Sequence, residues 1–429
     1  MVESTYNSKE EDTLSKTKPH IISKNLVMEA YQRVKANKGA AGVDQQSLES
    51  FELNLKDNLY KIWNRMSSGT YFPPPVKAVP IPKKTGGERI LGVPTVADRI
   101  AQMVVKLTFE PYVEPHFHED SYGYRPNKSA IDAIGVTRQR CWRYDYVLEF
   151  DIKGLFDNID HRLLLMAVRK HTDNPWVILY IERWLTTPMQ MPDGTLIEKT
   201  RGTMQGGVIS PVLSNLFLHY VFDVWMGKHH PGKQWCRYAD DALVHLKSEK
   251  EAQAMLVSLK QRFSMCELEL HPDKTKIIYC KDGNRRNQYS TTQFTFLGYD
   301  FRSRCSLNNK TNRVFQSFSP AVSKSATKSM REHIRSSGIR NRSDLSLKEI
   351  ADKYNPILSG WIGYYGCYHR TTLNSVMLHF NKTLTAWAMH KYKKLKRHKT
   401  KASRFILKIQ KENPLLFSHW KAGLGIGFA

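Results

Sequence analysis

The pattern of apolar and polar positions predicts alternating helices and strands from about residue 21 onward. Helical spacing of apolar residues predicts helices at 26–37, 48–66, 96–107, 161–171, 175–185, 210–225 and 248–265. Short apolar runs predict extended segments at 76–82, 146–152, 235–246 and 294–301. After residue 302 the pattern is helical, over 322–336, 347–365, 373–393 and 402–410. These patterns predict an α+β fold with a helical C-terminal part.

Two adjacent carboxylates, Asp240 and Asp241, interrupt the apolar region 235–246. Neighbouring strand residues point to opposite faces, so both side chains reach one place only where the chain bends, as in a hairpin turn. Two converging carboxylates repel each other unless a cation neutralises them. Aspartates are also common in turns for purely local reasons, so this pair alone does not establish a metal site.

Two segments upstream of the Asp pair favour a functional site over a purely local turn. Asp151 lies at the end of the apolar run 146–152 and supplies a third carboxylate. The glycine-rich stretch 202–211 opens the predicted helix 210–225. Such a loop permits close approach to a phosphate or a base.

In this order and spacing, the segments resemble reverse transcriptases, and specifically the group II intron reverse transcriptase/maturase family. Further blocks that carry the resemblance are 40–44, 82–89, 91–99, 121–126, 294–299 and 355–365. The resemblance implies a right-hand polymerase with fingers, a palm of antiparallel sheet with helices, and a helical thumb or maturase domain. The expected divisions are a flexible leader at 1–18, an N-terminal extension with fingers at 19–140, the palm with part of the fingers at 141–314, the thumb/maturase domain at 315–393, and a basic DNA-binding segment at 394–429.

The implied activity is that of an RNA-directed DNA polymerase, which extends a DNA primer on an RNA template with deoxynucleoside triphosphates. Such chemistry uses two Mg²⁺ ions, with Mn²⁺ as an alternative, held about 3.5–4 Å apart. By family correspondence Asp151 and Asp240 bridge both ions, Asp241 assists, and the carbonyl of Ile152 completes one site. Asp157 and Asp160 are expected to be structural or helix-capping residues.

Several residues are expected to contact the nucleotide by the same resemblance. Lys83 and Arg89 would face the triphosphate, because both cations can pair with phosphate. Phe156 matches a steric gate that excludes the ribose 2′-hydroxyl, which disfavours a viral RNA-dependent RNA polymerase. Gln205 and Gly206 would approach the nucleotide and the template base.

Two further blocks are less definite. Lys274 would protonate the leaving pyrophosphate, or it is a helix-end or solvated lysine. Glu269 and Pro272 stand near positions where the family usually has Gly and Asn, which leaves the alignment open by one residue. Phe296, Leu297 and Gly298 resemble a primer grip, where glycine lets the primer backbone approach closely.

Charge is concentrated in the last third of the chain. Residues 301–429 contain 25 Lys and Arg but only five Asp and Glu, which places +20 of the net +25 there. Aromatic residues are interleaved, which favours a folded nucleic-acid surface over a disordered tail. The expected partners are group II intron RNA, which the maturase region would fold for splicing, and target DNA. The basic candidates are Lys391, Lys393, Lys394, Lys396, Arg397, Lys399 and Lys401.

Other features narrow the classes of protein. No apolar window is long enough to span a bilayer, and no secretory signal precedes residue 21. The six cysteines form no CxxC pair, which predicts neither a zinc module nor a disulfide framework. We expect a cytoplasmic protein, and the sequence does not predict its oligomeric state. The resemblance is to the endonuclease-lacking type, whose mobility would use a pre-existing DNA 3′-end.

Two rival functions remain. One is a non-catalytic RNA-binding splicing cofactor with a decayed polymerase site, against which the intact Asp151, Asp240 and Asp241 argue. The other is a domesticated reverse transcriptase that serves defence or repair, which genomic context would distinguish.

Overall fold

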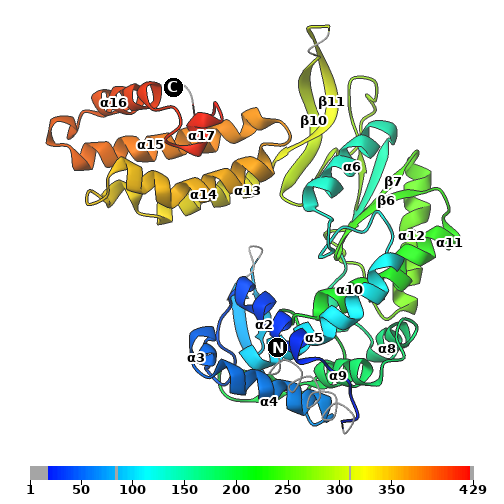
Figure 1. Cartoon of the computed structure of the whole chain (residues 1–429). Helices are drawn as coiled ribbons and strands as arrows, with labels where there is room; N and C mark the ends of the chain where they lie inside the picture. Colours follow the sequence, from blue (N-terminus) through cyan, green and yellow to red (C-terminus); the bar gives the residue numbers. More distant parts are fainter. Residues whose placement is uncertain (1–17, 83–85, 309–310, 426–429) are drawn as a thin grey trace, which may run out of the picture. The chain divides into compact units, whose positions relative to one another are not determined.

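The computed structural model describes residues 18–82, 86–308 and 311–425 (Figure 1). The predicted leader, except for Lys18, and Lys83 lie outside these residues. The chain forms two compact units, one of residues 1–128, 150–242 and 254–275, the other of residues 129–149, 243–253 and 276–429. The predicted five-part division remains a prediction, and the two units are described in turn.

The first unit is mainly helical. Its longer helices are α2 (Lys24–Asn37), α4 (Leu55–Ser67), α5 (Val96–Val113), α8 (His161–Arg169), α9 (Pro175–Thr186) and α10 (Ser210–Leu218). Short helices are α3 (Leu48–Glu52) and α7 (Leu155–Asn158). The single helix expected at 48–66 is wrong, because Asn54 leaves helical geometry at φ −125° and ψ 43° and separates α3 from α4.

A small sheet in this unit has the strand order β2-β1-β4-β5. Its strands are β1 (Val76–Pro82), β2 (Glu88–Val93), β4 (Met189–Gln190) and β5 (Leu196–Ile197). β1 and β2 are antiparallel, with Lys77 opposite Val93. Buried apolar side chains of β1 and β4 pack with Met204, which attaches the glycine-rich loop to this sheet.

The helix predicted at 210–225 is not uniform. Its middle, His219–Asp223, is a π-helical turn between α10 and α11 (Val224–His229). A π turn contains one more residue than an α turn, and such turns are frequent at functional sites.

A four-stranded sheet has the order β6-β7-β3-β8. The strands are β3 (Tyr146–Phe150), β6 (Gln234–Tyr238), β7 (Asp241–Leu246) and β8 (Lys276–Tyr279). β6 and β7 form a hairpin whose turn is Ala239-Asp240, so the expected bend at the Asp pair is present. β3 pairs antiparallel with β8, with Tyr146 opposite Tyr279. Helix α12 (Glu249–Met265) follows β7.

The second unit contains elements that the sequence did not predict. They are α6 (Ala130–Arg143) and the long strand β11 (Arg313–Val322), which pairs with β10 (Tyr299–Asn308). The single strand expected at 294–301 is wrong, because Leu297 (φ 50°) and Gly298 (φ 80°) turn the chain between β9 (Gln293–Phe296) and β10. The C-terminal helices therefore begin only after Val322.

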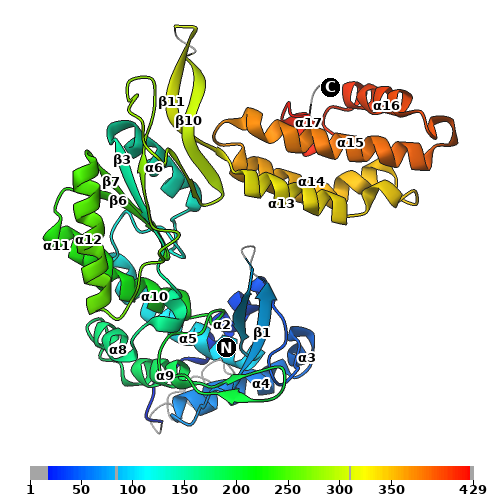
Figure 2. The same ribbon diagram turned by 180° about the vertical axis from the view of Figure 1, so that it is seen from behind.

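The C-terminal helices have a core of their own. They are α13 (Lys324–Ser336), α14 (Leu347–Tyr365), α15 (Asn374–Lys391), α16 (Lys399–Glu412) and α17 (Ser418–Lys421). Figures 1 and 2 show α15 between α16 and the pair α13–α14. Trp387 and Phe380 of α15 are buried at its centre. Across the described residues, no helix combines the length and apolar character needed to cross a membrane.

Candidate active site

The tip of the β6–β7 hairpin carries the two adjacent carboxylates. Ala239 adopts φ 56°, a left-handed conformation that tightens the turn. Burial, and then repulsion by Asp151, raises the pKa of Asp240. Reduced hydration, and then repulsion by Asp240 and Asp151, raises the pKa of Asp241 to about 7. Solvent still reaches the Asp241 side chain and partly screens this repulsion.

Asp151 lies directly after β3 and is 8 % exposed. The segment that leads to β8 fixes its backbone: the amide of His271 donates to the Asp151 carbonyl at 2.8 Å, and Ile152 pairs with Leu270 in an isolated bridge. The Lys274 ammonium donates to Oδ2 of Asp151. This hydrogen bond, together with attraction by Asp151, Asp241 and Asp240, raises the pKa of Lys274.

The three predicted carboxylates are therefore within electrostatic range of one another and of Lys274. Arg89 of β2 also lies in this range, because it lowers the pKa of Asp240 against the effect of burial. Lys274 is in a turn rather than at a helix end, so the helix-end alternative is wrong. Burial and like charge together make this an electrostatically strained acidic site.

The donor chemistry of this site fits a divalent cation. Within residues 18–82, 86–308 and 311–425, no set of three or more His, Cys, Asp or Glu side chains is arranged to hold a metal ion. Carboxylate oxygens are nevertheless the ligands that Mg²⁺ prefers. Burial, and then repulsion among the carboxylates, raises the pKa of Asp240 and Asp241, and a bound cation would offset both effects.

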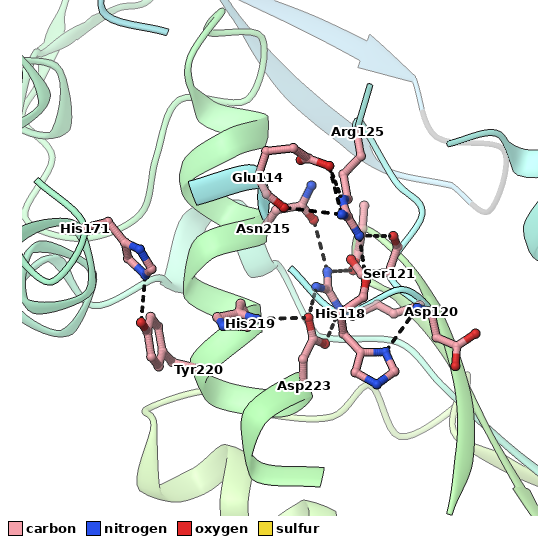
Figure 3. A network of polar contacts seen from close by, with 12 residues as sticks. Glu114, His118, Asp120, Ser121, Arg125, His171, Asn215, His219, Tyr220 and Asp223 are labelled. Carbon is pink, nitrogen blue, oxygen red and sulfur yellow. Dashed lines mark hydrogen bonds and ion pairs between the residues drawn. The ribbon is translucent and has the colours of Figure 1, made fainter. Parts of the chain in front are cut away.

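A buried ion pair between Arg237 and Asp223 supports the hairpin turn, and Figure 3 shows Asp223 of this pair together with Asn215 and His219. Arg237 of β6 is 1 % exposed and makes a two-point contact with Asp223, from Nε to Oδ1 at 2.8 Å and from Nη2 to Oδ2 at 2.6 Å. Its Nη1 donates to Oδ1 of Asn215 at 3.0 Å and to the carbonyl of Ala239 at 3.2 Å. Burial alone would raise the pKa of Asp223, but attraction by Arg237, the nearby His219 ring (Nδ1 to Oδ2 3.8 Å) and the hydrogen bonds from Arg237 hold it below its usual value. The guanidinium thus connects the π-helical turn to the turn that carries Asp240.

A second backbone contact fixes the same turn. A Cβ on Gly123 would lie 2.4 Å from the amide nitrogen of Ala239, so only glycine fits there. Asn215 donates to the Gly123 carbonyl at 2.6 Å, and the amide of Tyr122 donates to the Arg237 carbonyl at 2.8 Å. The segment around Gly123 therefore lies directly against the hairpin.

The block around Gly123 belongs to the segments that carry the family resemblance, but the sequence predicted no role for it. Arg237, Asp223 and Asn215 were not among the predicted site residues. A usable signal was present. Arg237 interrupts the apolar run 235–239, and Asp223 interrupts an apolar helix. Charged residues are almost never buried without a partner.

The glycine-rich loop is attached to β2. Gly206 has φ 112°, and a Cβ on it would lie 2.4 Å from the Gly92 carbonyl. The Gln205 carbonyl accepts a hydrogen bond from the Gly92 amide at 2.8 Å. Oε1 of Gln102 accepts from the amide of Val208 at 2.7 Å. These contacts hold Gln205 and Gly206 against the strand that carries Arg89.

Phe156 is half-buried on α7, and its carbonyl accepts from the amide of Thr203 at 2.7 Å. The helix that follows Asp151 is therefore joined to the same glycine-rich loop. Asp160 accepts from the amide of Leu163 at 2.7 Å and caps α8, which confirms its structural reading. Asp157 is exposed.

In the second unit, the predicted primer-grip residues form the β9–β10 turn. The Tyr364 hydroxyl donates to the Leu297 carbonyl at 2.8 Å. A Cβ on Gly298 would lie 2.9 Å from the Tyr365 hydroxyl. Close packing against α14 is therefore one reason why glycine is needed at this position. The close approach of a primer stays a prediction.

The basic C-terminal candidates differ among themselves. Lys391 donates to the carbonyls of Ser343 at 2.9 Å and Leu345 at 2.8 Å, so it ties α15 to the start of α14. The other six are exposed in the connection after α15 and in the first turn of α16: Lys393, Lys394, Lys396, Arg397, Lys399 and Lys401. These six form the basic surface that could meet a polyanion.

Comparison with known proteins gives two family matches. Residues 81–301 match the model for reverse transcriptase (RNA-dependent DNA polymerase). Residues 327–405 match the model for the group II intron, maturase-specific domain.

Individual relatives agree with these matches. The chain is 31% identical over 326 residues to protein YkfC of Escherichia coli K12, which covers 65% of this chain and 81% of that protein. It is 31% identical over 203 residues to the group II intron-encoded protein LtrA of Lactococcus lactis, or 47% of this chain and 33% of LtrA. It is 23% identical over 217 residues to nuclear intron maturase 4, mitochondrial, of Arabidopsis thaliana, covering 50% of this chain and 26% of that protein.

Proposed function

The chain belongs to the group II intron reverse transcriptase/maturase family, and from that premise we propose that it copies RNA into DNA at the site formed by Asp151, Asp240 and Asp241. The observation that carries the proposal is the convergence of these three carboxylates, in which burial and then mutual repulsion raise the pKa of Asp240 and Asp241. We further propose that the β6-β7-β3-β8 sheet is the palm, that the β1–β2 sheet belongs to the fingers, and that α13–α15 form the thumb.

The three carboxylates would hold the divalent cations, with the Ile152 carbonyl as a further oxygen ligand. When bound, Mg²⁺ supplies positive charge to the triphosphate and lowers the pKa of the primer 3′-hydroxyl. In the reaction the primer oxygen bonds to the α-phosphorus, and the bond from that phosphorus to pyrophosphate breaks. Burial of Asp151 and the buried Arg237–Asp223 pair keep the acids in place for this step.

Other residues would act on the nucleotide itself. Arg89, which is near enough to influence Asp240, would pair with the triphosphate together with Lys83. Lys274 holds its proton more firmly than an ordinary lysine, so it is charged when the triphosphate arrives and would donate that proton to the leaving pyrophosphate. Phe156 would exclude the ribose 2′-hydroxyl, and Gln205 with Gly206 would contact the base pair being formed.

The second part of the proposal is maturase activity. The maturase-specific match covers α13 to the first turns of α16, the region with the highest positive charge. We propose that this surface binds the folded intron RNA and stabilises the form competent for splicing. The exposed lysines after α15 and in the first turn of α16, with Arg397, would contact RNA or target DNA backbone.

Primer extension on an RNA template tests the polymerase assignment. Asp240→Ala should abolish cDNA synthesis, whereas Asp173→Ala, which removes an exposed aspartate from the loop before α9, should leave synthesis unchanged. Equal cDNA synthesis by wild type and Asp240→Ala would overturn the assignment.

The same assay separates the rival functions. A splicing cofactor without polymerase activity would give no cDNA with the wild-type protein and would still accelerate intron splicing. A domesticated enzyme would give cDNA, would bind no intron RNA and would leave splicing unchanged. The proposal requires both cDNA synthesis and faster splicing.

A further inference from the structure

A cavity of about 920 Å³ lies in the second unit, and none of the three carboxylates lines it. Helix α6, the β10–β11 hairpin, the loop 282–284 and the turn 367–369 surround it. The side chains that matter for the argument are Arg138, Trp142, Cys305, Phe315, Tyr368 and His369. Its volume is in the range of small-molecule sites.

In one wall of the cavity, the guanidinium of Arg138 on α6 lies against two aromatic rings, those of Trp142 and Tyr368. The Arg138 guanidinium carbon lies 4.3 Å from the centre of the Trp142 ring and 5.3 Å from that of Tyr368. The Trp142 indole N–H donates to the Phe318 carbonyl at 2.9 Å, which fixes the ring although 44% of the residue is exposed. Phe315 on β11 is 49% exposed. Exposed and immobilised aromatic faces are the usual stacking surfaces for unpaired bases.

The electrostatic field in the cavity is positive. Burial, and then repulsion by Arg304, Arg138 and Arg302, lowers the pKa of His369, so three guanidinium groups lie in range of one imidazole. Burial and the neighbouring Arg302 lower the pKa of Arg304 to about 10.

The acids near the cavity do not cancel this charge. Asp282 lines the cavity, but Arg285 pairs with it through Nε at 2.9 Å and Nη2 at 2.5 Å. Asp300 acts on Arg304, and its oxygens accept from the Thr295 hydroxyl and the Lys324 amide. Two acids facing four arginines (Arg138, Arg285, Arg302 and Arg304) leave a net preference for an anion.

We propose that this cavity binds an unpaired nucleotide of an RNA strand, with the base against the exposed faces of Trp142 and Phe315 and the phosphate paired with Arg138. The inference rests on the proposed function only in taking RNA as the ligand. A duplex cannot present a base face to these rings, because its bases are stacked on each other. Hydroxyl groups of Ser306 and Ser317 also line the cavity and can hydrogen-bond a ribose.

The cysteines of the chain provide a direct test. Cys305 and Cys367 line the cavity and are exposed, whereas Cys141, Cys236, Cys266 and Cys280 are buried. Alkylation of the folded protein should therefore modify Cys305 and Cys367, and mass spectrometry can follow each site. A short single-stranded RNA oligonucleotide should slow the alkylation of both at least about tenfold when its concentration is well above its dissociation constant.

Matched variants define the result. Arg138→Gln and Phe315→Ser should each abolish the protection, and Phe315→Ser affects an exposed ring whose removal does not disturb the core. Arg143→Gln removes the same charge from an exposed position on the same helix and should keep the protection. Unprotected cysteines in the wild type, or protection that survives both variants, would overturn the proposal. Equal protection by duplex RNA would overturn the unpaired-nucleotide assignment, and equal protection by a DNA strand of the same sequence would overturn the RNA assignment.

The polymerase proposal is tested separately in the same preparation. Asp240→Ala lacks an acid of the first unit and should still show full protection of Cys305 and Cys367. Loss of cDNA synthesis with retained protection supports both proposals, whereas active polymerase without protection overturns only the cavity proposal.

Discussion

Removal of Arg237 should both destabilise the protein and impair polymerisation. Arg237→Met keeps much of the side-chain volume but leaves the Asp223 carboxylate, 3 % exposed, without its partner. Breaking a buried pair in this way costs about 3–5 kcal/mol. Asn215 and the Ala239 carbonyl also lose a donor, at about 1–3 kcal/mol for each buried group left unsatisfied.

A double-mutant cycle separates these contributions. Asp223→Leu alone should be destabilising by a similar amount, because it leaves the guanidinium buried and unpaired. The double variant Arg237→Met/Asp223→Leu should recover roughly 3 kcal/mol relative to the sum of the single variants, since two apolar side chains can replace a buried pair at little cost. Recovery should be incomplete, because Asn215 and Ala239 still lack their donor.

Urea unfolding gives the stabilities, and primer extension gives the activity. The control is Arg169→Met, which breaks an exposed ion pair with Glu182 and should change the free energy of unfolding by less than about 1 kcal/mol. We expect the double variant to regain stability but not full activity, because the Ala239 carbonyl remains without its tether. A loss below about 1 kcal/mol for Arg237→Met, or additive single variants, would refute the reasoning.

Three further predictions concern the hairpin, the gate and a buried histidine. Gly123→Ala should lower the polymerisation rate on the order of a hundredfold, because the new Cβ would lie 2.4 Å from the Ala239 nitrogen; Gly227→Ala, with no atom within 4 Å, is the control, and equal rates would contradict this. Phe156→Ala should raise the incorporation of ribonucleotides relative to deoxynucleotides at least about tenfold, and an unchanged ratio in competition assays would remove the gate assignment. His245 is buried, neither ring nitrogen has a hydrogen-bond partner among the described residues, and burial followed by repulsion from Arg140 lowers its pKa to about 3. Its stabilising contribution should thus be fully present above the unfolded pKa of about 6.5 and be lost as pH falls toward 3, with a loss of about 3 kcal/mol already reached at pH 4.5. His245→Leu should flatten this acid dependence in urea titrations, and an unaltered pH profile would count against it.

The sequence predicted those elements whose burial follows a regular period. Helices such as α2 and α9 present one apolar stripe to a core, so their spacing is visible without the structure. The Asp240 turn was predictable as well, because two acids between apolar runs require a bend. The three carboxylates were chosen from the family resemblance together with this pattern.

The failures have physical causes too. The first four residues of β11, Arg313–Gln316, are all exposed, so this part of the strand has no apolar alternation to detect. Helix α6 was not predicted, although the sequence contains its capping box. In the structure Ser129 and Asp132 each accept a hydrogen bond from the other's backbone amide. The Arg237–Asp223 pair depends on tertiary packing between β6 and a non-α turn, which local periodicity does not contain.

The π-helical turn has a consequence for how the chain can vary in length. Each residue of an α-helix advances the chain by roughly 100° around the axis, so deletion of a single residue from His219–Phe222 would swing Asp223 away from the guanidinium that it holds. Substitutions within that stretch keep the angular phase, whereas insertions and deletions shift it. The residue count between α10 and β6 is therefore under a tighter constraint than the identity of most side chains there.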